Sequence, residues 1–149
     1  MCQSVRVDLQ QISDRLEIQD VLTRYTRAVD EGDWDKLDTV FTPDARIDYT
    51  ESGGIAGSFP EAKRWLAETL PAFFTATLHT VGQVSIEYDG SGDEADVIAY
   101  FDNPMLMRAG EGETTVIEVG GKYHHRMVRT PEGWRSKRLH EELVWKRGL

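Results

Sequence analysis

Cysteine is almost absent from this chain of 149 residues: Cys2 stands alone, so no disulfide can form within one copy of the chain. No apolar run approaches the roughly 20 residues that a membrane-spanning helix requires. The first residues also lack the apolar segment of a signal peptide. These absences predict a cytoplasmic protein that has no membrane partner.

Positive charge is scarce as well. Lys and Arg number 17 against 26 Asp and Glu, which gives a formal net charge of -9 at pH 7. A chain with this balance repels the phosphates of nucleic acids, so no nucleic acid is expected as a partner. The apolar fraction of 40% is ordinary for a globular domain, and a chain of this length can bury a core with room for a pocket.

The motifs of several common chemistries are missing. None of the spacings of a zinc site occurs among the four histidines, which are His79, His124, His125 and His140. The chain contains no nucleophile elbow, no P-loop and no glycine motif for a dinucleotide after a strand. We therefore expect no metal and no cofactor, which leaves histidine, carboxylate and tyrosine as the acid–base groups.

Helical periodicity dominates the first part of the chain. Asp14 and Glu17 have the spacing of a capping box, so the first helix is predicted to begin at Asp14 and to follow an N-terminal tail of residues 1–13. Its apolar stripe has helical spacing, and Gly32 is expected to end it as the glycine that follows the last turn.

Two further helices are expected before the period changes. A short one should follow Asp33, before a turn at residues 42–45 and a short strand at 46–49. A glycine-rich loop at residues 50–58 then leads to Ser58 and Glu61, whose spacing again predicts a capping box and a third helix.

After about residue 76 the pattern becomes alternating, as expected for strands. Hairpin-like turns divide four long strands, predicted near residues 77–88, 94–107, 115–129 and 134–146. This order predicts one α+β domain over residues 14–149: three N-terminal helices packed on a strongly curved, mostly antiparallel sheet, forming a cone that encloses one cavity. Because two strands carry apolar residues on both faces, a homo-oligomer, dimer or trimer, is expected through the convex face.

The end of the first helix raises a question of charge. Asp30 and Glu31 occupy its last turn, where the helix dipole disfavours carboxylates. Asp30 is either a solvated acid paired with Arg27 or a carboxylate that faces a group requiring an anion. Tyr25, near the middle of the apolar stripe, is likewise either a core residue or part of a site.

Several motifs resemble the SnoaL-like family of the nuclear transport factor 2-like superfamily. They are RYTRAVDEGDWDKLDTVFTPDARIDY at residues 24–49, the histidine at 79, GGKYHH at 120–125 and GW at 133–134. The resemblance is to the branch of scytalone dehydratase and bile-acid 7α-dehydratase, and it extends from about Asp14 to Trp145.

This resemblance implies an active site. His79 would be the general base and Asp30 its partner, while Tyr25 and Tyr49 would bind the developing enolate or the departing hydroxyl. His125 would replace, as an acid, the second pocket histidine of scytalone dehydratase, which this chain lacks. The substrate would be held by His125 and by several largely apolar side chains: Met107, Met127, Tyr123, Trp65 and Met105.

The function implied is that of a cofactor-independent, dehydratase-like lyase. Its partner would be a hydrophobic cyclic small molecule such as a steroid or a polyketide. Two alternatives stay open: an isomerase or polyketide cyclase of the same fold, and a small-molecule-binding domain without catalytic activity.

Overall fold

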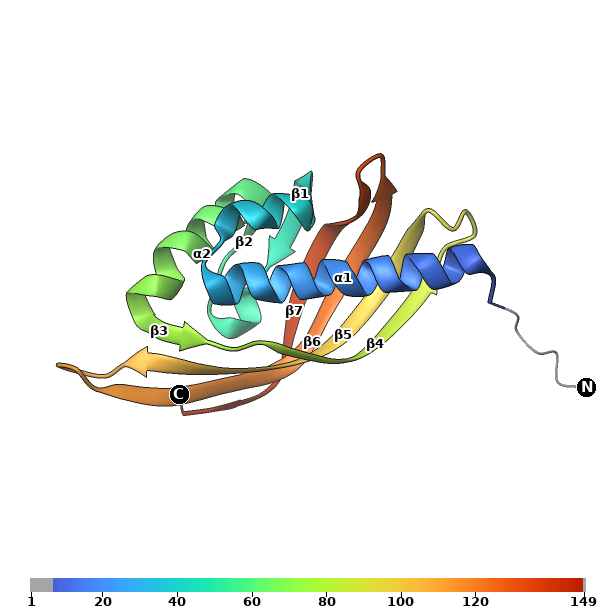
Figure 1. Ribbon diagram of the computed structural model, residues 1–149. Coiled ribbons are helices and arrows are strands. Elements are labelled where there is room, and N and C mark those ends of the chain that lie inside the picture. The colour runs from blue at the N-terminus through green and yellow to red at the C-terminus, as the bar shows by residue number, and fades with distance from the viewer. Residues whose placement is uncertain (1–6, 149) are drawn as a thin grey trace, which may run out of the picture.

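The computed structural model describes residues 7–148; Cys2 and the first part of the expected tail lie outside them. The chain forms an α+β fold in which two α-helices and a short 3₁₀-helix cover one face of a strongly curled sheet (Figure 1). None of the helices in this part of the chain combines the length and apolar character needed to cross a membrane.

Helix α1 (Leu9–Glu31) begins earlier than the sequence predicts. Asp8, not Asp14, is its N-cap, and it forms the capping box with Gln11. The predicted start was wrong because a capping-box spacing also occurs inside the helix. The predicted end is confirmed: Gly32 has φ 66° and its backbone N–H donates to Val29.

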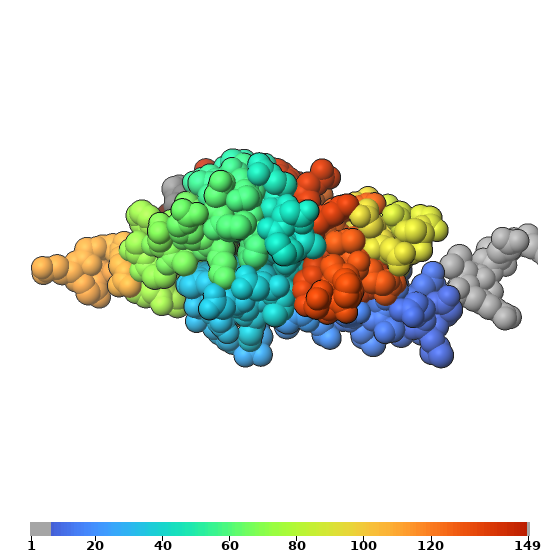
Figure 2. All heavy atoms as spheres, turned by 90° about the horizontal axis from the view of Figure 1, so that it is seen from above, coloured from blue at the N-terminus to red at the C-terminus, as the bar shows by residue number. Residues whose placement is uncertain are grey.

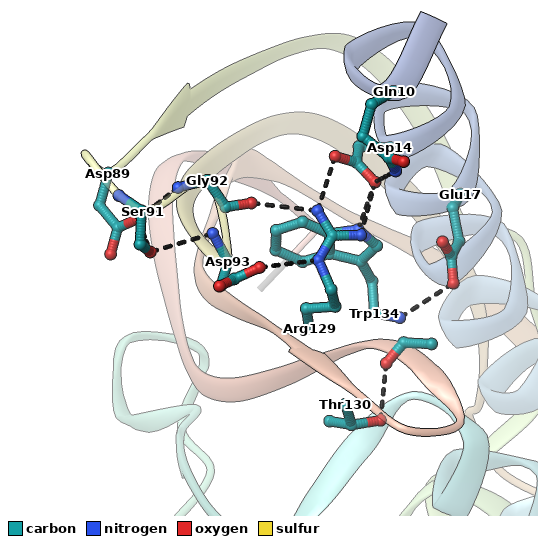
Figure 3. Close-up of polar contacts among 11 residues, drawn as sticks. Gln10, Asp14, Glu17, Asp89, Ser91, Gly92, Asp93, Arg129, Thr130 and Trp134 are labelled. Atoms are coloured by element: carbon teal, nitrogen blue, oxygen red, sulfur yellow. Dashed lines mark hydrogen bonds and ion pairs between the residues drawn. The ribbon is translucent and has the colours of Figure 1, made fainter.

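Asp14 instead links α1 to the sheet through hydrogen bonds (Figure 3). Its carboxylate accepts two hydrogen bonds from the Arg129 guanidinium, at 2.9 and 2.8 Å, and one from the indole of Trp134 at 3.0 Å. Glu17, one turn later, accepts the backbone N–H of Trp134 at 3.0 Å. The two acids therefore anchor the helix to the last hairpin.

The short second helix is a 3₁₀-helix, η1 (Trp34–Thr39). The turn expected at residues 42–45 is wrong, because these residues lie within strand β1 (Phe41–Asp48). A second 3₁₀-turn, η2 (Thr50–Ser52), and strand β2 (Ala56–Ser58) occupy the glycine-rich loop. The predicted capping box of Ser58 and Glu61 is confirmed at the start of α2 (Phe59–Phe73).

The remaining chain supplies the sheet. Its strands are β3 (Phe74–Thr77), β4 (Thr80–Tyr88), β5 (Glu94–Arg108), β6 (Thr114–Thr130) and β7 (Gly133–Arg147). The order is β2-β1-β7-β6-β5-β3, with β4 also paired to β5. All pairings are antiparallel except β1 with β7, which is parallel. The four predicted long strands are thus confirmed as β4, β5, β6 and β7, whereas the short strands β2 and β3 were not predicted.

Register shifts accompany the curl of the sheet. One lies at Gly120 and Gly121 of β6, where β6 pairs with β7. A Cβ atom on Gly121 would lie 1.9 Å from the backbone oxygen of Glu142, so only glycine permits this approach.

The helices cover the concave side of the sheet. Figure 2 shows α1 and α2 lying over the strands, while the turn between β5 and β6 projects beyond the helices at one end. The core between the layers joins the apolar stripe of α1 to inward-facing side chains of β5, β6 and β7, among them Val97, Tyr123 and Leu139.

Candidate active site

A cavity of about 270 Å³ lies between α1, α2, η2 and the concave face of the sheet. Its wall is mostly apolar, built by Trp65, Leu66 and Leu70 of α2 and by inward-facing residues of β5 and β6. Its polar groups come from separate elements: Tyr25, Tyr49, Ser52, Thr77, His79, Asn103 and Glu141. A pocket that is apolar with a few convergent polar groups is the usual form of a small-molecule site.

His79 and Asp30 meet at the edge of this cavity. Nδ1 of His79 lies 2.6 Å from Oδ1 of Asp30, and the side chains are only 6% and 16% exposed. Because a carboxylate can only accept, Nδ1 carries the hydrogen of this bond. Nε2 is then the free nitrogen of a ring that lines the cavity, with a lone pair that can accept a proton.

Two further donors fix the Asp30 carboxylate. The backbone N–H of His79 donates to Oδ2 at 2.8 Å, and the hydroxyl of Thr77 donates to Oδ1 at 2.9 Å. Burial acts to raise the pKa of Asp30, but these bonds and the His79 ring outweigh it and hold that pKa below its usual value. Asp30 is therefore an anion that holds the imidazole in one orientation.

Arg27, the alternative partner, is bonded to another acid of the helix and not to Asp30. It forms its hydrogen bonds with Glu31, one turn along the exposed face of α1, at 2.9 and 2.7 Å. The two acids at the end of the helix thus have separate partners. These partners offset the unfavourable interaction of each carboxylate with the helix dipole.

Tyr25 and Tyr49 form a second polar pair in the cavity wall. Their hydroxyls lie 2.7 Å apart and both residues are buried. Burial raises the pKa of each tyrosine well above its usual value, so both are neutral. One hydroxyl donates to the other, and the accepting hydroxyl keeps its own hydrogen, which it can donate to a ligand.

The residues expected to bind substrate fall into two groups. Trp65, Met105 and Met107 line the cavity, and Trp65 stacks on Tyr49 with ring centroids 6.0 Å apart. The placement of Tyr123, His125 and Met127 needs correction, because these side chains are buried in the core and do not line the cavity. Tyr123 instead packs between Tyr25 and Phe101.

His125 differs from the acid that was expected. Its Nδ1 contacts the hydroxyl of Ser136 at 2.9 Å, and burial lowers the pKa of the ring to about 3. A neutral imidazole at this depth is poorly suited to deliver a proton to the cavity. Strand alternation correctly points it inward, but it lies farther along β6 than the cavity extends.

Glu141 and Asn103 were missed by the sequence analysis. Both line the cavity, from β7 and β5, and they are 7% and 6% exposed. Alternation along β7 contains the signal for Glu141, because it places this residue on the same face as the buried Leu139. A charged residue at an inward position of a strand is unusual, and this feature could have identified Glu141 as a site residue.

The other histidines lie on the outer face of the sheet, beside an open depression of about 780 Å³. His124 contacts Glu142 at 2.8 Å, and His140 contacts Glu51 at 2.6 Å. Both ring nitrogens of His140 and Nε2 of His124 thus contact surface acids. Between residues 7 and 148 no group of three or more His, Cys, Asp or Glu side chains is placed to hold a metal ion.

Comparison with protein families gives one match across most of the chain. The sequence model of the SnoaL-like domain matches residues 10–140. An uncharacterized protein of Mycobacterium tuberculosis strain H37Rv is 45% identical over 125 residues, which span 84% of this chain and 82% of that protein. A Mycobacterium bovis protein matches to the same extent.

Solved structures share the fold at low sequence identity. A hexachlorocyclohexane dehydrochlorinase from Novosphingobium barchaimii has a TM-score of 0.81 and 19% identity, over 96% of this chain and 94% of that one. A protein assigned as a scytalone dehydratase from Novosphingobium aromaticivorans has a TM-score of 0.79 and 18% identity, over 91% and 87%. A nuclear transport factor 2-like superfamily protein from Salmonella enterica has a TM-score of 0.75 and 17% identity, over 93% and 96%.

Proposed function

The chain belongs to the SnoaL-like domain family, and from this premise we propose that it is a cofactor-independent lyase that removes water from a hydrophobic cyclic small molecule. A steroid or a polyketide is the class of substrate that suits the mostly apolar cavity. The observation that carries the proposal is the 2.6 Å contact between Nδ1 of His79 and Asp30, which leaves Nε2 as the free nitrogen of a ring on the cavity wall. Two proteins that share the fold are named for elimination reactions, which supports a lyase.

The mechanism begins with removal of a proton from a carbon next to a carbonyl. Nε2 of His79 takes that proton, and Asp30 stabilises the imidazolium that forms. The electron pair moves to the carbonyl as an enolate, then returns to form the double bond as the hydroxyl on the next carbon leaves. The imidazolium gives its proton to the departing hydroxyl, so that water is released and the base is restored.

The tyrosine pair supports the developing charge. Tyr25 and Tyr49 form one donor unit, and its spare hydroxyl hydrogen can bind the enolate oxygen. Among the described residues no Lys or Arg lines the cavity, so the His79 imidazolium is the only cation on these walls that a departing chloride would meet, whereas a departing hydroxyl can take the proton of that imidazolium. Loss of water therefore suits this site better than loss of chloride.

Two alternatives use the same cavity. An isomerase or polyketide cyclase would use the His79–Asp30 pair to move a proton but would release no water. A binding domain without activity would use the apolar wall alone. The mass of the product separates the first alternative from a lyase, and the effect of His79 variants separates the second.

The test uses β-hydroxy ketones of the steroid and polyketide classes, with loss of water followed by mass spectrometry. With a converted substrate in hand, His79→Ala and Asp30→Asn should each reduce turnover about 10²- to 10⁴-fold, the usual contribution of a positioned base. The double variant should lose little more, because the two residues act as one unit.

A matched control is His124→Ala, which removes a histidine from the outer face of the same sheet. It should leave turnover unchanged. Normal turnover by a folded His79→Ala chain would contradict the proposal, and release of a product with unchanged mass would favour the isomerase.

A further inference from the structure

Glu141 is a buried carboxyl beside the side chain of Ser52, and one of its two oxygens is unpaired among the described residues. Its side chain lines the cavity, it is 7% exposed, and its Oε1 atom has no hydrogen-bond partner within residues 7–148. No ion pair in this part of the chain includes it. An unsatisfied buried oxygen destabilises a fold, so this group is poorly explained as a support of the fold.

Asp14 provides the contrast within the same molecule. It is also buried, but a guanidinium, an indole and an amide side chain donate to it. A carboxylate that serves the fold is thus surrounded by donors, as burial requires. Among residues 7–148 Glu141 has no comparable set of donors, and its side chain lines the cavity.

Asn103 repeats the pattern on the neighbouring wall. Its Oδ1 atom is also buried without a partner among the described residues, and the side chain lines the same cavity. Two residues of the cavity wall therefore each hold an acceptor oxygen that is unpaired among the described residues, and a ligand that brings O–H or N–H groups would satisfy them.

We propose that Glu141, together with Asn103, binds a hydroxyl group of an uncharged ligand and makes the cavity exclude carboxylates. The inference deepens the proposed function because it names the charge class of the substrate of the same site. An anionic ligand brings only acceptors, and it meets no Lys or Arg on the walls described. Burial also raises the pKa of Glu141, and Oε1 can accept a hydrogen bond in either protonation state.

The test measures binding of two probes of one shape, 2-naphthol and 2-naphthoate, by calorimetry at neutral pH. The wild-type chain should bind the uncharged naphthol and bind naphthoate at least about tenfold more weakly, the effect of one unpaired buried polar group. Glu141→Gln keeps the shape and the acceptor but cannot carry a charge, so it should retain naphthol binding and gain naphthoate binding. Glu141→Leu should weaken naphthol about tenfold.

The matched control is Glu142→Gln, which alters the adjacent acid on the outer face and should change neither affinity. Circular dichroism checks that each variant is folded. Equal affinity of the wild type for both probes, an unchanged ratio in Glu141→Gln, or no binding of either probe would each overturn the proposal. This experiment measures binding and not turnover. It therefore tests the role of Glu141 in ligand selection independently of the role of His79 as the base.

Discussion

At the scale of single residues, three carboxyl groups are largely buried. Their contacts differ, and so do their roles. Asp14 is saturated by Arg129 and Trp134. Asp30 is held by donors from one short segment that also carries the candidate base. Glu141 faces a cavity with Oε1 unpaired. The same functional group thus anchors a helix, orients an imidazole or meets a ligand according to the donors that surround it.

Asp14 allows a prediction of stability at this scale. Asp14→Ala leaves the Trp134 indole without an acceptor and removes a partner of Arg129, so we expect a loss of about 3 kcal/mol in the free energy of unfolding. Asp93→Ala, which removes the exposed partner of the same Arg129, should cost under about 1 kcal/mol. Urea denaturation followed by circular dichroism measures both values, and equal losses would contradict the assignment.

The pH dependence of that stability follows from the pKa of Asp14, which the hydrogen bonds of Arg129, outweighing burial, lower to about 2. The folded-state pKa lies below the unfolded value of about 3.9, so the folded chain binds fewer protons between them. The stabilisation is complete above the unfolded value and is lost as the pH falls toward 2. The difference between wild type and Asp14→Ala should therefore shrink over this range.

At the scale of elements, the loop between β1 and α2 forms one wall of the candidate site. Tyr49 begins η2, whose Ser52 lines the cavity, and Trp65 of α2 stacks against Tyr49. Gly54 lies behind this stack, where an added Cβ would be 2.7 Å from Cβ of Tyr49 and 2.9 Å from the Trp65 ring. The loop can close on the cavity only because this position has no side chain.

Gly54→Ala should therefore disturb both the wall and the fold. We expect a loss of about 1–3 kcal/mol in stability, as for other overpacked sites, and weaker binding of 2-naphthol, measured by calorimetry. Gly90→Ala is the matched control, because a Cβ there meets nothing within 4 Å. Identical melting temperatures and affinities for the two variants would show that the loop tolerates the added methyl.

At the scale of the whole molecule, the outer face of the sheet carries exposed apolar side chains on neighbouring strands. Tyr100, Leu106 and Val116 are exposed there, and Leu106 lies directly opposite Val116 in the pairing of β5 with β6. Their inward neighbours Phe101, Met107 and Ile117 pack on the core or line the cavity. Neighbouring apolar side chains that are exposed, as Leu106 and Val116 are, are typical of an interface between copies.

We therefore expect a dimer or trimer at micromolar concentration, measured by light scattering coupled to gel filtration. Val116→Lys should shift the mass to that of a monomer, because a buried, unpaired ammonium opposes association. Leu16→Lys, on the exposed side of α1, is the matched control and should leave the mass unchanged. A monomeric wild type would refute the interface.

The sequence by itself determined the long strands, the end of α1, the start of α2 and the faces that these elements bury. Alternation predicts the long strands, glycine ends α1 at Gly32, and Ser58 with Glu61 starts α2. Tyr25 and Tyr49 could be placed on inward faces for the same reason, because side-chain direction repeats with the local period. The pairing of His79 with Asp30 came from a family resemblance, since no period relates residues so far apart in the chain.

Only the tertiary structure decided which inward residues reach the cavity. His125 and Glu141 both point inward from long strands, yet one is buried in the core and the other lines the cavity. Alternation fixes the face of a residue but not its depth, which depends on where α1, α2 and η2 cover the sheet. The parallel pairing of β1 with β7 and the Asp14–Arg129 anchor were decided in the same way, because contacts between distant segments arise from packing and leave no local pattern.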